Sequence, residues 1–160
     1  MSRKKIRLSN FNYSATGAYF ITICTQHKIP YLGNKQTLKK NKFGEIVLRS
    51  WIDIEKIYNN TAIDYFVIMP NHIHGIIFLY NDSEENQNKN NIITIIKNFK
   101  SYTTNQYGTL VKQDGWKPYK TRLWQRGYYE HVIRNEHSLN KLRNYIINNP
   151  LKWKLDRHYV

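Results

Sequence analysis

The sequence predicts an α+β fold in which an antiparallel sheet is packed against helices. Three observations support this fold class: runs of β-branched and aromatic residues, apolar stripes at helical spacing, and two strand-like runs joined by the turn Pro70-Asn71. The elements follow the order strand, helix, strand, strand, helix, strand, with one more helix at the C-terminus. This is the ferredoxin-like order that RNA-recognition (RRM) domains also use. It predicts two helices on one face of the sheet and an open face for a ligand.

The elements of the first half each have a recognisable pattern. Residues 18–25 are dense in β-branched and aromatic side chains, which favours a strand. Between about residues 44 and 59, apolar residues recur at helical spacing. Residues 62–69 and 72–80 are two further apolar runs, and the turn between them predicts a hairpin.

The second half begins after an entirely polar stretch, residues 81–90, which we expect to be a surface loop. Apolar residues at 92, 95, 96 and 99 then favour a helix, although their isoleucine content alone would also suit a strand. Residues 123–133 predict the fourth strand. Asn135 or Ser138 can cap a last helix that runs to about residue 149, where Pro150 stops it.

The composition indicates one domain with a polyanionic partner. The chain has 160 residues, so we expect a single domain over 1–160 with a basic tail at 1–10. The 25 Lys and Arg against 11 Asp and Glu give a formal charge of +14, with a pI of about 9.8. This excess argues against a neutral metabolic enzyme and favours a nucleic acid as partner. With a lone cysteine, Cys24, and no apolar run of signal-peptide or membrane-span length, we expect a cytoplasmic protein without disulfides.

The sharpest local motif is Met69-Pro70-Asn71-His72-Ile73-His74-Gly75. Residues two apart on a strand share a face, so His72 and His74 present two imidazoles side by side while Ile73 points into the core. Such a pair can begin a divalent metal site, or it can simply be the solvated face of a hairpin. Asp64 is the only acidic residue near the pair in sequence. It could support a metal ligand from behind, or it could simply be a turn residue. Of the other histidines, His131 and His137 lack metal-ligand spacing, while His27 is expected in a loop and His158 lies near the C-terminus.

The last helix carries a second candidate pair, Tyr145 and Asn149, which are four residues apart and share one helical face. A tyrosine hydroxyl can act as a nucleophile where a metal or a base favours the phenolate. The amide oxygen of Asn149 is a hard ligand suited to Mg²⁺ or Mn²⁺. The commoner use of such residues is structural, with the tyrosine packed on the core and the asparagine ending the helix.

Basic residues interleaved with aromatic rings form a third candidate site. This pattern is typical of proteins that bind single-stranded nucleic acid, although an ordinary solvated loop is the alternative. A lysine-rich loop at 35–42 adds further charge, and Trp124 is expected in the core. The expected nucleic-acid contacts are Arg3, Lys4, Lys5 and Arg7 in the tail, and Lys112, Trp116, Lys117, Tyr119, Lys120, Arg122 and Arg126.

Together these motifs resemble those of the REP-associated tyrosine transposases, relatives of the IS200-like, single-tyrosine HUH transposases of insertion sequences. The resemblance covers nearly the whole chain. It rests on M-P-N-H-x-H at 69–74, W-Q-R-x-x-Y-E-H-x-I-R-N-E at 124–136 and Y-I-x-x-N-P at 145–150, in this order. Each motif is short, but the ordered set is highly specific.

The resemblance implies a role for each candidate residue. His72 and His74 match the HUH metal ligands, Tyr145 the nucleophile, and Asn149 the third protein ligand, where related insertion-sequence enzymes have a glutamine. It implies an enzyme dependent on Mg²⁺ or Mn²⁺ that nicks and rejoins single-stranded DNA at REP-type hairpins through a 5′-phosphotyrosine. It also implies a monomer or a homodimer that exchanges catalytic helices, associated with the bacterial nucleoid.

Two other functions are compatible with the residues themselves. A non-catalytic, RRM-like protein would bind hairpin DNA or RNA without cleaving it. A zinc hydrolase would use the same histidine pair, but the sequence offers no third nitrogen or carboxylate ligand near it.

Overall fold

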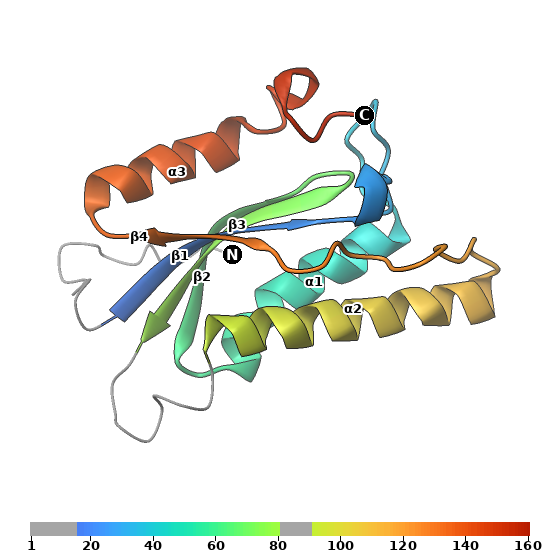
Figure 1. Cartoon of the computed structure of the whole chain (residues 1–160), viewed down its shortest axis with the longest axis horizontal. Coiled ribbons are helices and arrows are strands. Elements are labelled where there is room, and N and C mark those ends of the chain that lie inside the picture. Colours follow the sequence, from blue (N-terminus) through green and yellow to red (C-terminus); the bar gives the residue numbers. More distant parts are fainter. Residues whose placement is uncertain (1–15, 81–90) are drawn as a thin grey trace.

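The computed structural model describes residues 16–80 and 91–160. Within these ranges four strands form one sheet of order β2-β3-β1-β4, in which all neighbours are antiparallel. The strands are β1 (Thr16–Cys24), β2 (Thr61–Ile68), β3 (His72–Tyr80) and β4 (Tyr129–Ile133). This ferredoxin-like arrangement confirms the predicted fold class (Figure 1). The predicted tail at 1–10 and loop at 81–90 lie outside the described residues.

Two helices, α1 (Lys42–Ile57) and α2 (Ile92–Asp114), cover one face of the sheet as predicted (Figure 1). The larger core lies between them and the sheet, where the rings of Trp51 and Phe99 meet edge to face at 5.4 Å. Gly75 makes this packing possible, because a Cβ on it would lie 2.2 Å from the Trp51 ring. The packing of Trp51 therefore explains why the histidine motif ends in a glycine.

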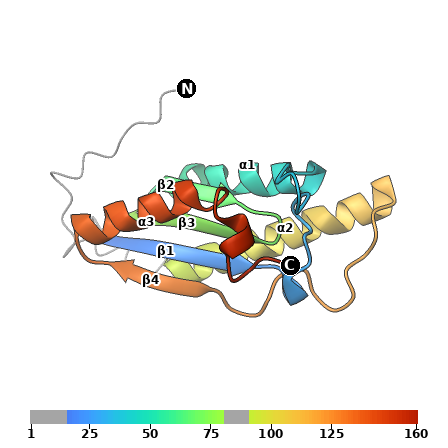
Figure 2. The same cartoon turned by 90° about the horizontal axis from the view of Figure 1, so that it is seen from above.

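A third helix, α3 (Glu136–Asn148), lies across the opposite face of the sheet (Figure 2). Its residues Leu139 and Ile146 form a smaller core with Phe20, Ile76 and Phe78 of the sheet. The expectation of an open sheet face is therefore wrong. The apolar stripe of the last helix was visible in the sequence, but the stripe alone does not say which face of the sheet it covers.

The fourth strand is shorter than predicted, since β4 begins at Tyr129 rather than at residue 123. Before it, the segment pairs only through an isolated bridge between Trp124 and Thr25, the residue after β1. The Lys100 amine donates to the carbonyls of Gln125 and Gly127 at 2.6 and 2.8 Å. The carbonyls of Gln125 and Gly127 are therefore occupied by a side chain, and Gly127 has a left-handed backbone with φ 68°. For these reasons the regular hydrogen bonding between β4 and β1 starts only after Gly127.

The C-terminal segment, residues 150–160, follows α3 and turns back to the end of the sheet (Figure 2). It contains the short 3₁₀ helix η4 (Trp153–Leu155). Trp153 anchors it, because its ring is buried and its Nε1–H donates to the Lys35 carbonyl at 2.9 Å. The segment therefore covers the strand ends where the histidine motif begins. Among the described residues, no helix has both the length and the apolar character to cross a membrane.

Candidate active site

His72 and His74 lie on β3, on the face that α3 and the C-terminal segment cover. Their rings are 0% and 1% exposed, and the ring centroids are 4.6 Å apart. Ile73 points to the opposite face and joins the larger core, as the strand periodicity predicts. Because both imidazoles are buried, the interpretation of the pair as a solvated hairpin face is wrong.

Hydrogen bonds at Nδ1 fix the orientation of both rings. His72 Nδ1 lies 2.8 Å from Asn71 Oδ1, which can only accept, so the histidine donates. His74 Nδ1 lies 2.8 Å from Thr22 Oγ1 on β1. With Nδ1 of His72 protonated, its Nε2 carries a lone pair, and that buried atom has no hydrogen-bond partner. Histidines held through Nδ1 with Nε2 free have the arrangement of metal ligands.

Burial keeps both imidazoles neutral. Burial, together with the positive charges that His74 and His158 would carry, lowers the pKa of His72 to about 2. Burial, with smaller effects from His158 and Arg157, lowers the pKa of His74 to about 3. A metal binds neutral imidazole, so neither ring has to lose a proton before it can coordinate at neutral pH.

Helix α3 brings both of its candidate residues to the histidine pair. The Tyr145 hydroxyl lies 3.5 Å from His74 Nε2, and the side chain is 44% exposed, so a ligand in solvent can reach it. The aromatic ring of Phe20 stacks on His74 at 5.5 Å and meets Tyr145 edge-on at 6.0 Å. Asn149, at the end of the helix, is buried, and its Oδ1 has no hydrogen-bond partner.

The hydroxyl of Tyr145 is not activated by the protein alone. Its partial burial raises the pKa above the usual value, and the carboxylate of Asp156 raises it further. Arg157 and a hydrogen bond with Asn149 act in the opposite direction but are weaker. At neutral pH the phenol therefore stays protonated unless further positive charge reaches the site.

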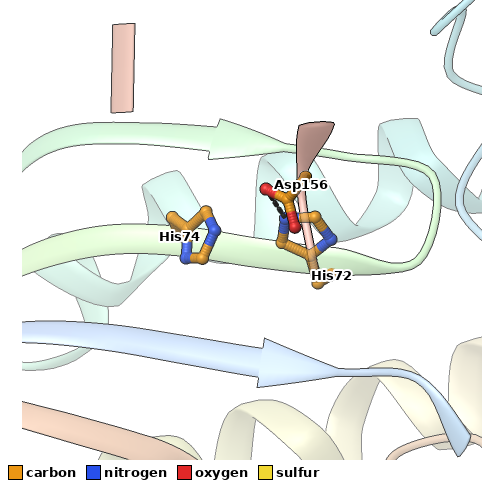
Figure 3. Close-up of side chains that lie close together, drawn as sticks. All are labelled: His72, His74 and Asp156. Carbon is orange, nitrogen blue, oxygen red and sulfur yellow. Dashed lines mark ion pairs between the residues drawn. The ribbon is translucent and has the colours of Figure 1, made fainter. Parts of the chain in front are cut away.

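Asp156 is a site residue that the sequence did not reveal. Its carboxylate is 5% exposed, and Oδ2 lies 4.0 Å from His72 Nε2 and 3.1 Å from Asn149 Nδ2. Figure 3 shows it pointing from the C-terminal segment to the His72 ring. Single potential ligand atoms of His72, His74 and Asp156 all lie within 4.8 Å of one another, so the three could hold a metal ion. No motif in the sequence connects Asp156 with the distant histidines.

His158 also reaches the site, although its place near the C-terminus does not indicate this in the sequence. Its ring lies 4.4 Å from that of His72 and 6.0 Å from that of His74. Its backbone carbonyl accepts a hydrogen bond of 2.7 Å from Asn71 Nδ2, and its Nδ1 lies 3.7 Å from Cys24 Sγ. The Asn71 that orients His72 therefore also holds the C-terminal segment.

The donor atoms at this site fit a divalent cation. Two buried polar atoms at the site, His72 Nε2 and Asn149 Oδ1, have no hydrogen-bond partner, and a bound cation would satisfy both. Neutral imidazole nitrogens, an amide oxygen and a carboxylate are a donor set that Mn²⁺ accepts, and the oxygens also suit Mg²⁺.

The predicted nucleic-acid residues are only partly brought together. Tyr119, Arg122 and Arg126 line a cavity of about 440 Å³ between α2 and the segment before β4, with Lys100 beside them. The cavity lies beside α2, on the face of the sheet opposite to that of His72 and His74, and is connected to β1 by the hydrogen bond from the Gln125 backbone N–H to the Cys24 carbonyl. The residues Lys112, Trp116, Lys117 and Lys120 do not line it. Arg3, Lys4, Lys5 and Arg7 are outside the described residues.

Fold and site together define a ferredoxin-like protein with a buried histidine pair facing a helix-borne tyrosine. The chain belongs to the IS200-like transposase family, whose profile, "Transposase IS200 like", matches residues 18–149. Membership in this family makes it a DNA-processing enzyme. The family match ends at Asn149, so Asp156 and His158 lie beyond it.

Three known proteins are similar over most of the chain. An uncharacterized protein from Haemophilus influenzae is 35% identical over 168 residues, covering 99% of this chain and 93% of its own. The structure of a REP-associated tyrosine transposase bound to a REP hairpin has a TM-score of 0.63 at 20% identity, covering 98% and 77%. The structure of a transposase candidate from Deinococcus radiodurans R1 has a TM-score of 0.52 at 16% identity, covering 92% and 97%. At these identities the two structures establish the shared fold.

Proposed function

We propose that this protein nicks and rejoins single-stranded DNA at REP-type hairpins, with Tyr145 as the nucleophile and a divalent cation as cofactor. The observation that carries the proposal is the half-exposed Tyr145 side chain, whose hydroxyl lies 3.5 Å from Nε2 of His74 in the buried, neutral histidine pair. Family membership supports transposase chemistry, and the similarity to the hairpin-bound transposase supports the hairpin as substrate. A target of this kind places the protein at the bacterial nucleoid.

Three residues would hold the cation in this proposal: His72, His74 and Asn149. The ligand atoms would be His72 Nε2 and Asn149 Oδ1, which have no hydrogen-bond partner, and His74 Nε2, which faces the Tyr145 hydroxyl. When bound, Mg²⁺ or Mn²⁺ would supply positive charge that stabilises the phosphate oxygens and favours the phenolate. Thr22 and Asn71 keep the two imidazoles in position through their Nδ1 atoms.

Tyr145 would carry out the covalent step. Its oxygen forms a bond to phosphorus while the bond from phosphorus to the 3′ oxygen breaks. The proton that the phenol loses is balanced by the proton that the departing 3′ oxygen takes up. The resulting 5′-phosphotyrosine is still a diester, so a second 3′-hydroxyl can reverse the step and join a different strand. Tyrosine therefore permits strand transfer where an attacking water would give hydrolysis.

Arg122 and Arg126 would contact DNA phosphates at the cavity beside α2, with Tyr119 available for stacking on a base. The formal charge of +14 favours such contacts throughout. We infer that one domain provides both recognition and chemistry, and that the centre is complete within one chain because α3 packs on its own sheet.

Adduct formation tests the proposal against a protein that only binds hairpins. Labelled REP-type hairpin DNA with a single-stranded flank is incubated with Mn²⁺ and resolved on a denaturing gel. We expect a protein–DNA adduct that disappears with EDTA and with Tyr145→Phe. Tight binding by the unaltered protein without any adduct would contradict nicking and favour the non-catalytic alternative.

A further inference from the structure

We propose that Asp156 is a fourth protein ligand of the divalent cation, so that the C-terminal segment completes the metal centre. This inference rests on the proposed function, because it concerns the same cation. It adds a carboxylate from outside the region that the family profile matches. The donors would then be two imidazoles, one amide oxygen and one carboxylate.

The carboxylate of Asp156 is buried, and its ion-pair partner is not a permanently charged side chain. It is 5% exposed, and within the described ranges its one ion pair is with His72, at 4.0 Å. That partner is an imidazole, which lacks the permanent positive charge of a lysine or an arginine. A buried carboxylate is costly unless a cation balances it, and a coordinated divalent ion provides that balance.

The two carboxylate oxygens have different surroundings. Oδ1 accepts the His158 backbone N–H at 2.7 Å, which fixes the side chain. Oδ2 points to the atoms of the proposed centre, 4.0 Å from His72 Nε2 and 3.1 Å from Asn149 Nδ2 (Figure 3). Asn149 Nδ2 donates a hydrogen bond to Oδ2, which keeps a further lone pair, so the oxygen that can bind a cation is the one that faces the other ligands.

The segment that carries Asp156 is held against the site on both sides of that residue. Before it, Trp153 is buried and bonded to the Lys35 carbonyl. After it, the Arg157 carbonyl accepts from the Lys28 amine at 2.8 Å, and the His158 carbonyl accepts from Asn71 Nδ2 at 2.7 Å. These contacts make the position of Asp156 a fixed feature of the fold.

Metal affinity without DNA tests this inference apart from the chemistry. Mn²⁺ is titrated into the Tyr145→Phe protein by calorimetry, with and without Asp156→Asn. The asparagine keeps the oxygen that accepts from His158 but removes the negative charge. We expect the Kd for Mn²⁺ to rise at least about tenfold. The matched control is Asp53→Asn, an exposed carboxylate paired with Lys56 on α1, which should leave the Kd unchanged. An unchanged Kd with Asp156→Asn would overturn the inference.

A spectroscopic variant separates a ligand from a residue that only orients Asn149. In the background Cys24→Ser, which removes the one native thiol, Asp156→Cys places a thiolate donor at this position. Co²⁺ should then produce a near-ultraviolet thiolate-to-metal charge-transfer band that the Cys24→Ser parent lacks. Circular dichroism in EDTA checks that both proteins are folded. A folded variant that binds Co²⁺ without this band would overturn direct ligation.

The same titrations distinguish a failure of the inference from a failure of the proposed function. If His72→Ala abolishes Mn²⁺ binding and Asp156→Asn does not weaken it, only the role of Asp156 is wrong. If His72→Ala binds Mn²⁺ as tightly as its parent, the histidine centre is wrong, and both proposals fail.

Discussion

Arg143 binds Asp64 through two hydrogen bonds, of 2.7 Å from Nε and 2.8 Å from Nη2, and so ties α3 to β2 two residues before Tyr145. The two side chains are 15% and 9% exposed, and the guanidinium carbon lies 5.1 Å from the centre of the Tyr65 ring. A largely buried, bidentate pair of this kind fixes both distance and angle. The contact positions the tyrosine opposite His74 of the same chain.

Removal of this contact should loosen the catalytic helix. For Arg143→Ala we expect about 2 kcal/mol less stability in urea unfolding, because the substitution leaves the Asp64 carboxylate mostly buried and unpaired. Adduct formation should slow at least tenfold, since a small displacement of the nucleophile has a large effect on rate (about a hundredfold for 1 Å). Lys56→Ala breaks an exposed pair on α1 and is the control, which should leave the stability almost unchanged. Equal effects of the two substitutions would contradict the positioning role.

The position of α3 predicts a centre formed within one chain. Tyr145→Phe lacks the nucleophile and His72→Ala lacks a metal ligand, so each protein alone should be inactive. A mixture of the two should remain inactive, as measured by adduct formation on hairpin DNA. Recovery of adduct in the mixture would show instead that chains exchange their helices and that Tyr145 acts on the histidines of a partner.

Thr22 should affect metal affinity through His74. Thr22→Val keeps the shape of the side chain but removes the oxygen that lies 2.8 Å from His74 Nδ1. We expect Mn²⁺ affinity to fall about 10- to 100-fold in a titration, with the fold intact. Thr104→Val on α2, which removes a hydroxyl bonded to the Lys100 carbonyl, is the matched control. A Thr22 variant with the affinity of this control would argue that Thr22 does not support the ligand.

Stability of the metal-free protein should decrease as the pH falls below about 6.5. The pKa of His72 is lowered to about 2 and that of His74 to about 3, whereas in the unfolded chain both take up protons near pH 6.5. Between about pH 6.5 and 3 the unfolded state therefore binds more protons, and the free energy of unfolding decreases as the pH is lowered. Urea unfolding in EDTA across this range measures the slope. The double variant His72→Gln, His74→Gln should show a smaller dependence of unfolding free energy on pH. An equally steep slope in this variant would contradict the attribution of the pH dependence to the two histidines.

Arg122 should contribute to DNA binding by charge. For Arg122→Ala we expect weaker binding of hairpin DNA and a salt dependence reduced by about one phosphate contact, measured by fluorescence anisotropy at several salt concentrations. The rate of adduct formation at saturating DNA should not change. Arg49→Ala, an exposed arginine on α1 that does not line the cavity, is the control. The same salt slope for both variants would argue against DNA contact at this cavity.

The chemistry-bearing residues on regular elements could be predicted from the sequence. Strand periodicity predicts that His72 and His74 share one face of a strand, and helical spacing predicts that Tyr145 and Asn149 share one face of the last helix. The structure brings the two pairs together, with Tyr145 and His74 in contact. Asn135 was one of two predicted caps, and its side chain accepts from the Ser138 amide, so it starts α3. Such spacing predicts which side chains lie together, because residues two apart share a face of a strand and residues three or four apart share a face of a helix.

Asp156 and His158 could not be predicted, because they lie beyond the last regular helix in a segment with no periodic pattern. Their placement depends on the tertiary contacts of Trp153 and Asn71, which no local rule encodes. The sequence argues against a zinc hydrolase because it offers no third ligand, either a nitrogen or a carboxylate, near the two histidines. The structure brings one there, so that objection does not hold, and transposase chemistry is favoured on the family match and on Tyr145 instead.

Peptide mapping of the protein–DNA adduct is the most direct test of Tyr145 as the nucleophile. The adduct formed with Mn²⁺ on hairpin DNA is digested with protease and nuclease, and the modified peptide is sequenced by mass spectrometry. We predict a single modified residue, Tyr145, linked to the 5′ phosphate of the DNA. Attachment at another residue, or an adduct of undiminished yield from Tyr145→Phe, would contradict this mechanism.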